Sequence, residues 1–321
     1  MMQRTIHMLR IPRPRWNLAA VTMLLAFLLN SATSWAQSNQ GVILGTVKDS
    51  GGALVSGAAV TLLNNDEGIA RQTTSNSSGN FQFLDAEPAH YTVSVTVDGF
   101  EKWSVTNVPL VARQQLRFDV TLTIGSVQQG VVVNGDSASA IETETNSISA
   151  VYTHEDVENL PVNNRAGSGG TSGLSIISTL PGVQSEGGAY SLQGGLPFET
   201  EVAVDGITVQ SAGGGNSPIA DAFPSTEAIS ELRTDGVGNS AEFGQPGEVS
   251  IVTKGGTNKL HGSAFWYHQN AAFDSIPFGA ASKPHKVGNT FGAELSGPVV
   301  IPHLFNGHDR TFFFEIGRAH V

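Results

Sequence analysis

The sequence predicts a mainly β protein in three parts: an antiparallel β-sandwich, a mixed α+β domain and the first strands of an incomplete transmembrane β-barrel. Three observations predict this fold class. Apolar residues alternate at a period of two along short segments, which is typical of half-buried strands. Clusters of Gly, Asn, Asp and Ser separate these segments, and Gly alone accounts for 37 of 321 residues. Towards the C-terminus, aromatic-rich segments of about ten residues alternate apolar with polar side chains, as barrel strands do.

Residues 1–36 predict a secretory signal peptide. Four arginines lie in the first 15 residues, the apolar run Leu18–Leu29 follows, and Ser34–Ala36 offers a small-x-small cleavage site. We therefore expect export through the Sec pathway and cleavage between Ala36 and Gln37. A transmembrane anchor is the alternative, but a helix of this length spans only about 18 Å of a hydrocarbon core of about 30 Å. The chain has no cysteine that could carry a lipid anchor.

Charge and cysteine content exclude several classes of function. Residues 1–36 hold four of the 17 basic residues and none of the 28 acidic ones, so the rest of the chain carries a formal charge of −15. Binding to phosphates needs clustered Lys and Arg, and we therefore expect no nucleic-acid partner. Without cysteine the chain has neither a disulfide framework nor thiol catalysis.

Residues 41–123 predict a complete small β-sandwich. Every second residue is apolar in Tyr91–Val97 and in Leu116–Leu122, which places one face of each strand in a core. Turn-forming clusters at 49–52, 64–66 and 76–80 separate the earlier segments. About seven short strands are expected at this spacing. The segments that stand out as strands are Val42–Lys48, Ala59–Leu63, Ile69–Ser75, Phe81–Leu84, Tyr91–Val97 and Leu116–Leu122.

Residues 124–150 predict a linker, because the run Asp136–Ser149 is polar and offers little to bury. Residues 151–256 predict a mixed α+β domain with long Gly-rich loops and little helix. One short helix is expected in this domain, with Thr153 as its cap, Asp156 three residues later and Pro161 as its boundary.

Residues 257–315 predict the first barrel strands, at His261–Asn270, at Asn289–Ser296 and from Thr311 onward. In the second of these, apolar residues alternate with polar residues and glycine, as they do between the lipid and lumen faces of a barrel. An ordinary soluble hairpin is an equally good interpretation of these strands alone. Phe265, Trp266 and Tyr267 are expected to form part of a lipid-interface girdle, and a sugar-stacking patch is the alternative.

Residues 41–123 resemble the carboxypeptidase regulatory-like domain, which implies a transthyretin-like fold. The residues that carry the resemblance are Gly45–Asp49, Val55–Ala58, Ser78–Phe83 and Tyr91–Phe100. The turn glycines and paired aromatic residues fall in the order of the family. One departure is Pro88–His90, which stands where a glycine usually precedes the tyrosine.

The second half resembles the plug and first barrel strands of TonB-dependent receptors, most closely the Oar-like group. This implies that 151–256 is a plug domain. Gly255-Gly256 departs from the usual Ser-Gly, and the insert Gly167–Gly173 lengthens a loop. The short motifs that carry the resemblance over about 160 residues are Leu160–Arg165, Leu180–Val183, Val204–Ile207, Ala241–Gly244, Val252–Asn258, His261–Phe265, Asn289–Gly292 and Gly297–Pro298.

The resemblance implies an outer-membrane receptor for a bulky nutrient, such as an oligosaccharide, with the sandwich on the periplasmic side. Its implied partners are the TonB complex of the inner membrane, outer-membrane lipid and a ligand that the sequence does not identify. Such receptors expose a short segment that pairs with an edge strand of TonB. Val131, Val132 and Val133 lie where such a segment is expected, and a first plug strand is the alternative. A surface adhesion or carbohydrate-binding β protein is the alternative function.

We expect no catalytic, cofactor or metal site, and therefore a protein that is not an enzyme. The His-x-x-Glu and His-Glu-x-x-His spacings of zinc peptidases are absent from the sequence. His261 and His268 lie seven residues apart on an expected strand, which places them on opposite faces. Gly236–Ala241 imitates a dinucleotide-binding fingerprint, but the Pro- and Gly-containing segment after it does not predict the required helix.

The last six residues, Ile316–Val321, fit neither the strand alternation nor the family. They correspond to the translation of a common sequencing adapter. We therefore expect that the natural chain continues after Glu315 and that the sequence is a truncated receptor.

Overall fold

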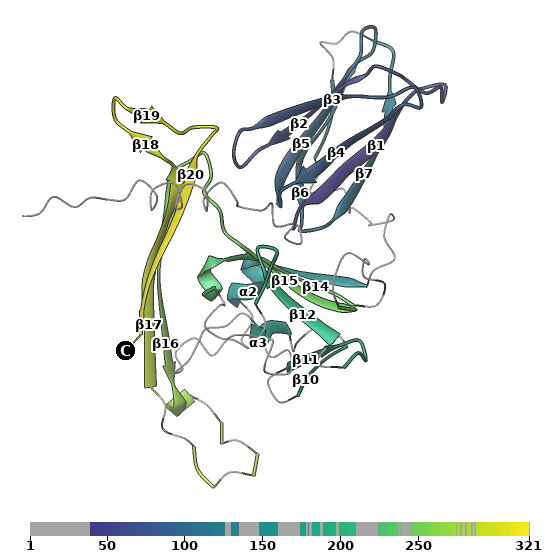
Figure 1. Ribbon diagram of the computed structural model, residues 1–321. Coiled ribbons are helices and arrows are strands. Elements are labelled where there is room, and N and C mark those ends of the chain that lie inside the picture. Colours follow the sequence, from purple (N-terminus) through teal and green to yellow (C-terminus); the bar gives the residue numbers. More distant parts are fainter. Residues whose placement is uncertain are drawn as a thin grey trace, which may run out of the picture. The chain divides into compact units, whose positions relative to one another are not determined.

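The structure is a computed structural model, and it describes residues 39–125, 130–134, 148–159 and 174–320 apart from short gaps, the longest at 210–223 and 239–244. The predicted signal peptide and its cleavage site at Ala36 and Gln37 lie outside the described residues. Within the described part, strands dominate and the helices are short (Figure 1). The prediction of a mainly β fold is confirmed.

The N-terminal part is a β-sandwich of two sheets. One sheet has the strand order β4-β1-β7 and the other has the order β3-β2-β5-β6-β8. The strands are β1 (Gly41–Asp49), β2 (Ala59–Asn64), β3 (Ala70–Thr74), β4 (Asn80–Ala86), β5 (Ala89–Thr96), β6 (Lys102–Leu110), β7 (Gln115–Leu122) and β8 (Gly130–Asn134).

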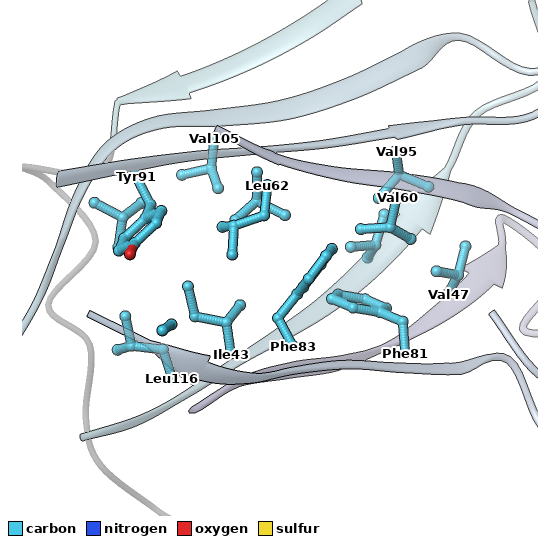
Figure 2. Packing of buried hydrophobic residues seen from close by; sticks show 14 of the residues in the cluster. Ile43, Val47, Val60, Leu62, Phe81, Phe83, Tyr91, Val95, Val105 and Leu116 are labelled. Carbon is cyan, nitrogen blue, oxygen red and sulfur yellow. The ribbon is translucent and has the colours of Figure 1, made fainter. Parts of the chain in front are cut away.

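The sandwich core consists of the apolar residues at alternate strand positions (Figure 2). Tyr91, Val93 and Val95 of β5 are buried, as are Leu116 and Val120 of β7. The predicted inward faces of these two strands are therefore confirmed. Phe81 and Phe83 of β4 pack edge-to-face in the same core, with ring centroids 6.4 Å apart.

The three turn clusters close through asparagine or aspartate side chains, as their composition predicts. The Asp49 carboxylate accepts hydrogen bonds from the backbone N–H groups of Gly51 and Ala53, at 2.9 and 2.8 Å. The side chains of Asn64 and Asn76 accept equivalent bonds from the residues that follow them.

The sandwich differs from the sequence expectation in two respects. Strand β6 was not apparent in the sequence, because Asn107 adopts a left-handed φ of 57° and Pro109 interrupts the alternation. The sandwich is also not wholly antiparallel, since β1 pairs with β7 and β6 pairs with β8 in parallel. Strand β8 belongs to the sheet order of the sandwich, although residues 130–134 were expected in a linker.

The middle of the chain forms a five-stranded sheet with the order β13-β12-β15-β14-β9. Its strands are β9 (Ser149–Thr153), β12 (Thr200–Val204), β13 (Ile207–Thr208), β14 (Ile229–Asp235) and β15 (Gly247–Thr253). The hairpin of β10 (Val183–Glu186) and β11 (Ala189–Leu192) is separate. The remaining elements are α2 (His154–Asn159), α3 (Leu174–Ile177) and the single turn η4 (Thr226–Ala228).

Helix α2 is the helix that the sequence predicts after Thr153. The Asp156 carboxylate accepts hydrogen bonds from the Thr153 backbone N–H at 3.0 Å and from the Thr153 hydroxyl at 2.8 Å. In return, the Asp156 backbone N–H donates to the Thr153 hydroxyl oxygen at 3.4 Å, and this reciprocal arrangement is a capping box that fixes the start of the helix. Val157 of α2 packs in a second core with Leu232 and Ile251 of the five-stranded sheet.

The C-terminal part is a three-stranded antiparallel sheet with the order β16-β17-β20. Its strands are β16 (His261–Asn270), β17 (Val287–Pro298) and β20 (Phe312–His320), accompanied by the turn η5 (Ala271–Phe273) and the hairpin of β18 (Val300–Ile301) and β19 (Phe305–Asn306). The first two strands are confirmed. The alternation was expected to end at Glu315, but β20 stays paired with β17 as far as His320.

Among the described residues, no helix has the length and apolar character needed to cross a membrane.

Candidate functional site

One face of the five-stranded sheet carries a buried layer of charged residues. Paired strand positions place Glu201, Glu248 and Asp235 in one row across β12, β15 and β14. Glu231 and Arg233 lie on the same face of β14, because they alternate with Asp235 along the strand. All five side chains are buried. We call these five residues, together with Arg113 of the sandwich, the charge layer.

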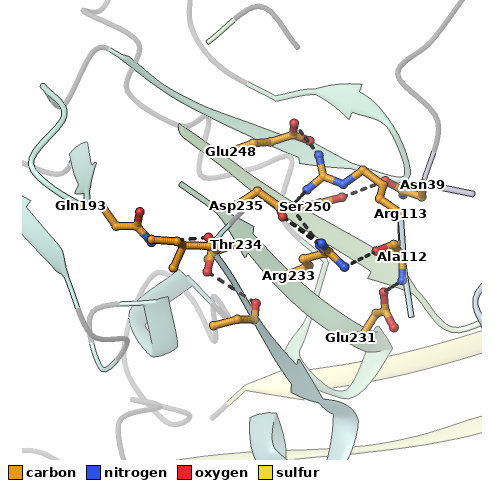
Figure 3. Close-up of polar contacts among 12 residues, drawn as sticks. Asn39, Ala112, Arg113, Gln193, Glu231, Arg233, Thr234, Asp235, Glu248 and Ser250 are labelled. Carbon is orange, nitrogen blue, oxygen red and sulfur yellow. Dashed lines mark hydrogen bonds and ion pairs between the residues drawn. The ribbon is translucent and has the colours of Figure 1, made fainter. Parts of the chain in front are cut away.

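The loop between β6 and β7 supplies the groups that meet this face (Figure 3). The Ala112 N–H donates to Glu231 Oε1 at 2.5 Å, and Arg233 Nη1 donates to the Ala112 carbonyl at 2.9 Å. Arg113 forms ion pairs with Asp235 and with Glu248. The Arg113 backbone has a left-handed φ of 59°, which turns the loop sharply at this residue.

Carboxylates outnumber guanidinium groups in the charge layer. Burial raises the pKa of Glu231 to about 7, although the Ala112 N–H and the two arginines oppose the shift. Burial likewise raises the pKa of Glu248 to about 7; Arg113 opposes the shift, whereas Asp235 and Glu201 add to it. A fraction of the Glu231 and Glu248 carboxyl groups is therefore protonated near neutral pH. The side chains of the charge layer form ion pairs and hydrogen bonds with one another and with the loop between β6 and β7, as in a buried polar contact.

The sequence analysis did not identify any residue of the charge layer. Its signal is the alternation in Glu231–Asp235, where charged side chains occupy every second position of an otherwise typical strand. Such a pattern ordinarily marks a solvent-exposed face. Burial of this face depends on contacts with Ala112 and Arg113, which lie more than 100 residues earlier in the chain.

The three-stranded sheet has one apolar and one polar face. Trp266, Phe291 and Leu295 share a face and are 69%, 46% and 48% exposed. Thr290 and Glu294 lie on the opposite face, where Thr290 is fully buried. This division confirms the alternation predicted for Asn289–Ser296. It is the division expected between lipid and lumen in a barrel wall.

The polar face carries a connected group of side chains. Glu294 accepts a hydrogen bond from the Ser263 hydroxyl at 3.1 Å. Lys254, which follows directly after β15, forms an ion pair with Glu294 at 3.1 Å. His261 Nε2 lies 3.1 Å from the Ser296 hydroxyl. The ion pair links the end of the five-stranded sheet to the wall formed by β17.

The aromatic residues of β16 do not form a single patch. Phe265 and Tyr267 stack on the polar face, with ring centroids 5.6 Å apart. A Cβ atom at Gly292 would lie within 2.5 Å of the Phe265 ring, so glycine is needed there. Trp266 lies on the apolar face and donates from its ring N–H to Asn289 at 3.1 Å. Of these three residues, Trp266 alone lies on the apolar face, and it alone is consistent with a role in a lipid-interface girdle.

The proposed coupling residues Val131, Val132 and Val133 lie in β8. Their backbone pairs in parallel with Trp103, Ser104 and Val105 of β6. The alternative that they form the first plug strand is wrong, because β8 belongs to a sheet of the sandwich and not to the five-stranded sheet.

The sequence analysis rejected a metal site and a dinucleotide-binding fingerprint, and the structure can be compared with both. Among the described residues, no group of three or more His, Cys, Asp or Glu side chains is placed to hold a metal ion. The strands on either side of Gly236–Ala241 are antiparallel neighbours, whereas a dinucleotide-binding fingerprint requires parallel strands joined by a helix.

Two family models match the chain. Residues 42–123 match the carboxypeptidase regulatory-like domain, and residues 252–316 match the outer membrane beta barrel domain. Among curated proteins, the TonB-dependent transporter Oar of Myxococcus xanthus is 24% identical over 304 residues. The match covers 90% of this chain, which spans about a quarter of the relative's length (27%).

Two solved structures are also similar to the chain. The siderophore receptor PirA from Acinetobacter baumannii is 24% identical, with 50% of this chain and 23% of that chain covered and a TM-score of 0.35. A type II cohesin–X-dockerin complex from Acetivibrio cellulolyticus is 18% identical, with 26% and 58% covered and a TM-score of 0.22. Both TM-scores are too low for these likenesses to carry an argument.

The match to the regulatory-like domain falls on the sandwich, and the match to the barrel domain falls on the three-stranded sheet. The match to the Oar relative covers 90% of the chain. The chain is therefore similar, over most of its length, to an Oar-like TonB-dependent transporter, and part of it matches an outer membrane beta barrel domain.

Proposed function

We propose that the chain is the N-terminal part of a receptor that imports a bulky nutrient, such as an oligosaccharide, across the outer membrane. The observation that carries this proposal is the two-faced sheet β16-β17-β20, which follows directly after the five-stranded sheet. In this assignment the five-stranded sheet belongs to a plug at 151–256, and the sandwich extends into the periplasm. The chain has no catalytic role in the proposal.

The genomic sequence downstream of the Glu315 codon tests the proposal. We expect several hundred further codons with alternating strands of about ten residues each, because three strands cannot close a barrel and an open edge in lipid leaves backbone groups unpaired. A stop codon after Val321, or a continuation of further sandwich repeats, would contradict the transport function. Repeats would instead favour a surface adhesion protein.

Cleavage between Ala36 and Gln37 is part of the same proposal, since an outer-membrane protein must first be exported. N-terminal sequencing of the protein from outer membranes is expected to begin at Gln37. A start at Met1 would contradict Sec-dependent processing.

We also propose that Val131, Val132 and Val133 couple the receptor to TonB. Their extended conformation and their position between the two domains support this role. Proline at Val132 removes a backbone N–H that strand pairing needs, whereas alanine keeps it. We expect Val132→Pro, but not Val132→Ala, to abolish crosslinking to TonB and ligand uptake in the full-length receptor. Unchanged crosslinking in the proline variant would refute the coupling role.

A further inference from the structure

The β18–β19 hairpin, which connects β17 to β20, presents apolar side chains to solvent (Figure 1). The Gly307 N–H donates to the Val299 carbonyl at 2.9 Å, and the Val299 N–H donates to the Thr311 carbonyl, also at 2.9 Å. The Leu304 N–H donates to the Ile301 carbonyl at 3.0 Å and closes the tip. The large apolar side chains of the hairpin are between 40% and 81% exposed; they are Val300, Ile301, Leu304 and Phe305.

The exposure of these four side chains indicates a surface that meets another molecule or a membrane. Single exposed apolar residues are common, whereas a contiguous exposed group usually marks an interaction site. The backbone hydrogen bonds hold the four residues together at one end of the three-stranded sheet.

The hairpin borders a groove of about 560 Å³ that continues the apolar face of the three-stranded sheet. Phe313 pairs with Gly297, which alternates with Leu295 along β17 and therefore lies on the apolar face. Leu260 covers Gly297, since a Cβ atom at Gly297 would lie 3.0 Å from the Leu260 side chain. The groove is thus an extension of the proposed lipid-facing surface. Its lining is mainly apolar and consists of Leu260, Pro298, Val299, Val300, His308 and Phe313.

Two basic residues lie at the same end of the sheet. The Asn258 side-chain amide donates to Asp309 Oδ1 at 2.6 Å, and the Asp309 N–H donates to Asn258 Oδ1 at 3.0 Å. This contact brings the next residues along the chain, Lys259 and Arg310, to the base of the hairpin, where both are exposed. Neither of these two cationic side chains has a hydrogen-bond or ion-pair partner within the described part of the chain.

The distribution of charge along the chain also favours an anionic partner at this end of the molecule. Residues 37–253 hold seven basic and 24 acidic residues, whereas residues 254–315 hold five basic and four acidic residues. An apolar groove with two cationic side chains at its base matches a molecule that carries a hydrocarbon chain and an anionic headgroup.

We propose that the β18–β19 hairpin and its groove bind an anionic phospholipid of the leaflet on the sandwich side. An acyl chain lies in the groove, the phosphate lies against Lys259 and Arg310, and Leu304 enters the boundary between headgroups and acyl chains. The bound lipid sets the depth of the wall in the membrane. This inference rests on the barrel wall of the proposed function and adds a lipid partner with a defined site.

A fluorophore attached at the tip of the hairpin tests the inference. Leu304→Cys is labelled in the full-length receptor, because residues 1–321 contain no cysteine and any cysteine beyond them is replaced by serine. The receptor is reconstituted in phosphatidylcholine vesicles that contain a quencher lipid. This lipid carries a nitroxide near the headgroup end of an acyl chain and has either a phosphatidylglycerol or a phosphatidylcholine headgroup. Control labels are placed at Ser77, an exposed residue of the sandwich, and at Leu295 on the apolar face.

We expect quenching at Leu304→Cys to need about fivefold less of the phosphatidylglycerol quencher than of the phosphatidylcholine quencher, because basic residues near a membrane surface favour anionic lipid. Lys259→Gln/Arg310→Gln is expected to remove this preference, whereas the label itself stays quenched. Lys283→Gln is the control, because this residue lies in the loop at the other end of β16 and β17 and its loss should leave the preference unchanged. The label at Ser77 is expected to escape quenching.

Equal quenching of Leu304→Cys by the two headgroups would overturn the inference. A label at Leu304 that is shielded from water but quenched by neither lipid would indicate a protein cover and would also overturn it. The label at Leu295 separates this inference from the proposed function. If Leu295→Cys is quenched in either case, the wall lies in lipid and only the phospholipid site is refuted. If Leu295→Cys also escapes quenching, the barrel wall itself is refuted.

Discussion

Arg113 of the sandwich and Glu248 of β15 form a buried ion pair, with 2.5 Å between Nη1 and Oε2 and side-chain exposures of 9% and 2%. The same guanidinium group also pairs with Asp235, whose side chain is 4% exposed. Two carboxylates therefore depend on one arginine that lies in a loop of another domain. Removal of that arginine would leave both carboxylates buried with less positive charge nearby to offset the free-energy cost of their burial.

Arg113→Met is therefore expected to lower the free energy of unfolding by about 3–5 kcal/mol, which is typical for removal of one partner of a buried pair. Chemical denaturation at pH 7.5 measures the effect. Arg117→Met is the matched control, because Arg117 and Asp119 form an exposed ion pair, and such pairs contribute about 0–1 kcal/mol. Equal losses in the two variants would show that the charge layer is not buried in solution.

The charge layer also predicts a pH dependence of stability. Burial raises the pKa values of Glu231 and Glu248 to about 7, from 4.5 in an unfolded chain. The folded state therefore binds more protons between these values, and stability falls as the pH rises from about 4.5 to about 7. Above pH 7 both groups are ionised in either state and the effect is constant. At 1.36 kcal/mol per pKa unit, the loss amounts to about 3 kcal/mol for each group.

The variant Glu231→Gln/Glu248→Gln isolates this contribution. A glutamine carbonyl at position 231 still accepts the Ala112 N–H, but it does not titrate. Denaturation at pH 5 and pH 8 is expected to show a smaller difference in the variant than in the parent chain. An undiminished difference would assign the pH dependence to other groups.

The sequence predicted those features that depend on local pattern. Alternation located β5 and β7 together with their buried faces, and the cap of α2 followed from Thr153 and Asp156. Strand β6 was missed because Asn107 and Pro109 break the alternation, although the strand pairs with β5 and β8 in the fold. Local pattern is a weak guide where tertiary contacts decide the structure.

The charge layer and the strand pairing of Val131–Val133 both depend on such tertiary contacts. The charges of β14 alternate as they do on a solvated face, but contacts with the Ala112–Arg113 loop help to bury that face. The position of Val131–Val133 between two domains was visible in the sequence, but its partner strand was not. A parallel partner is not joined by a short turn, so nothing near the segment indicates β6.

The apolar face of β17 predicts that a charged substitution is tolerated on the polar face of the β16–β17 pair and not on its apolar face. Leu295→Arg places a charge on the proposed lipid face, where it costs about 2–4 kcal/mol at the bilayer midplane and less near the interfaces. Ser263→Arg places the same charge on the opposite face, beside Glu294. We expect Leu295→Arg to reduce the amount of folded full-length receptor in outer membranes, measured by heat-modifiable gel mobility. Equal amounts of both variants would favour the soluble-hairpin interpretation.

The ion pair of Lys254 with Glu294 predicts that the five-stranded sheet is attached to the wall at its C-terminal end. The side chains are 20% and 14% exposed, so the contact is better shielded from water than a surface pair. Hydrogen bonds to charged groups contribute about 1.5–3 kcal/mol, and we expect a loss of this size in Lys254→Met. A double-mutant cycle with Glu294→Gln in the full-length receptor, followed by thermal unfolding, measures the coupling between the two residues. Additive losses would show that the pair does not hold the sheet to the wall, because a direct contact makes the second substitution cost less than the first.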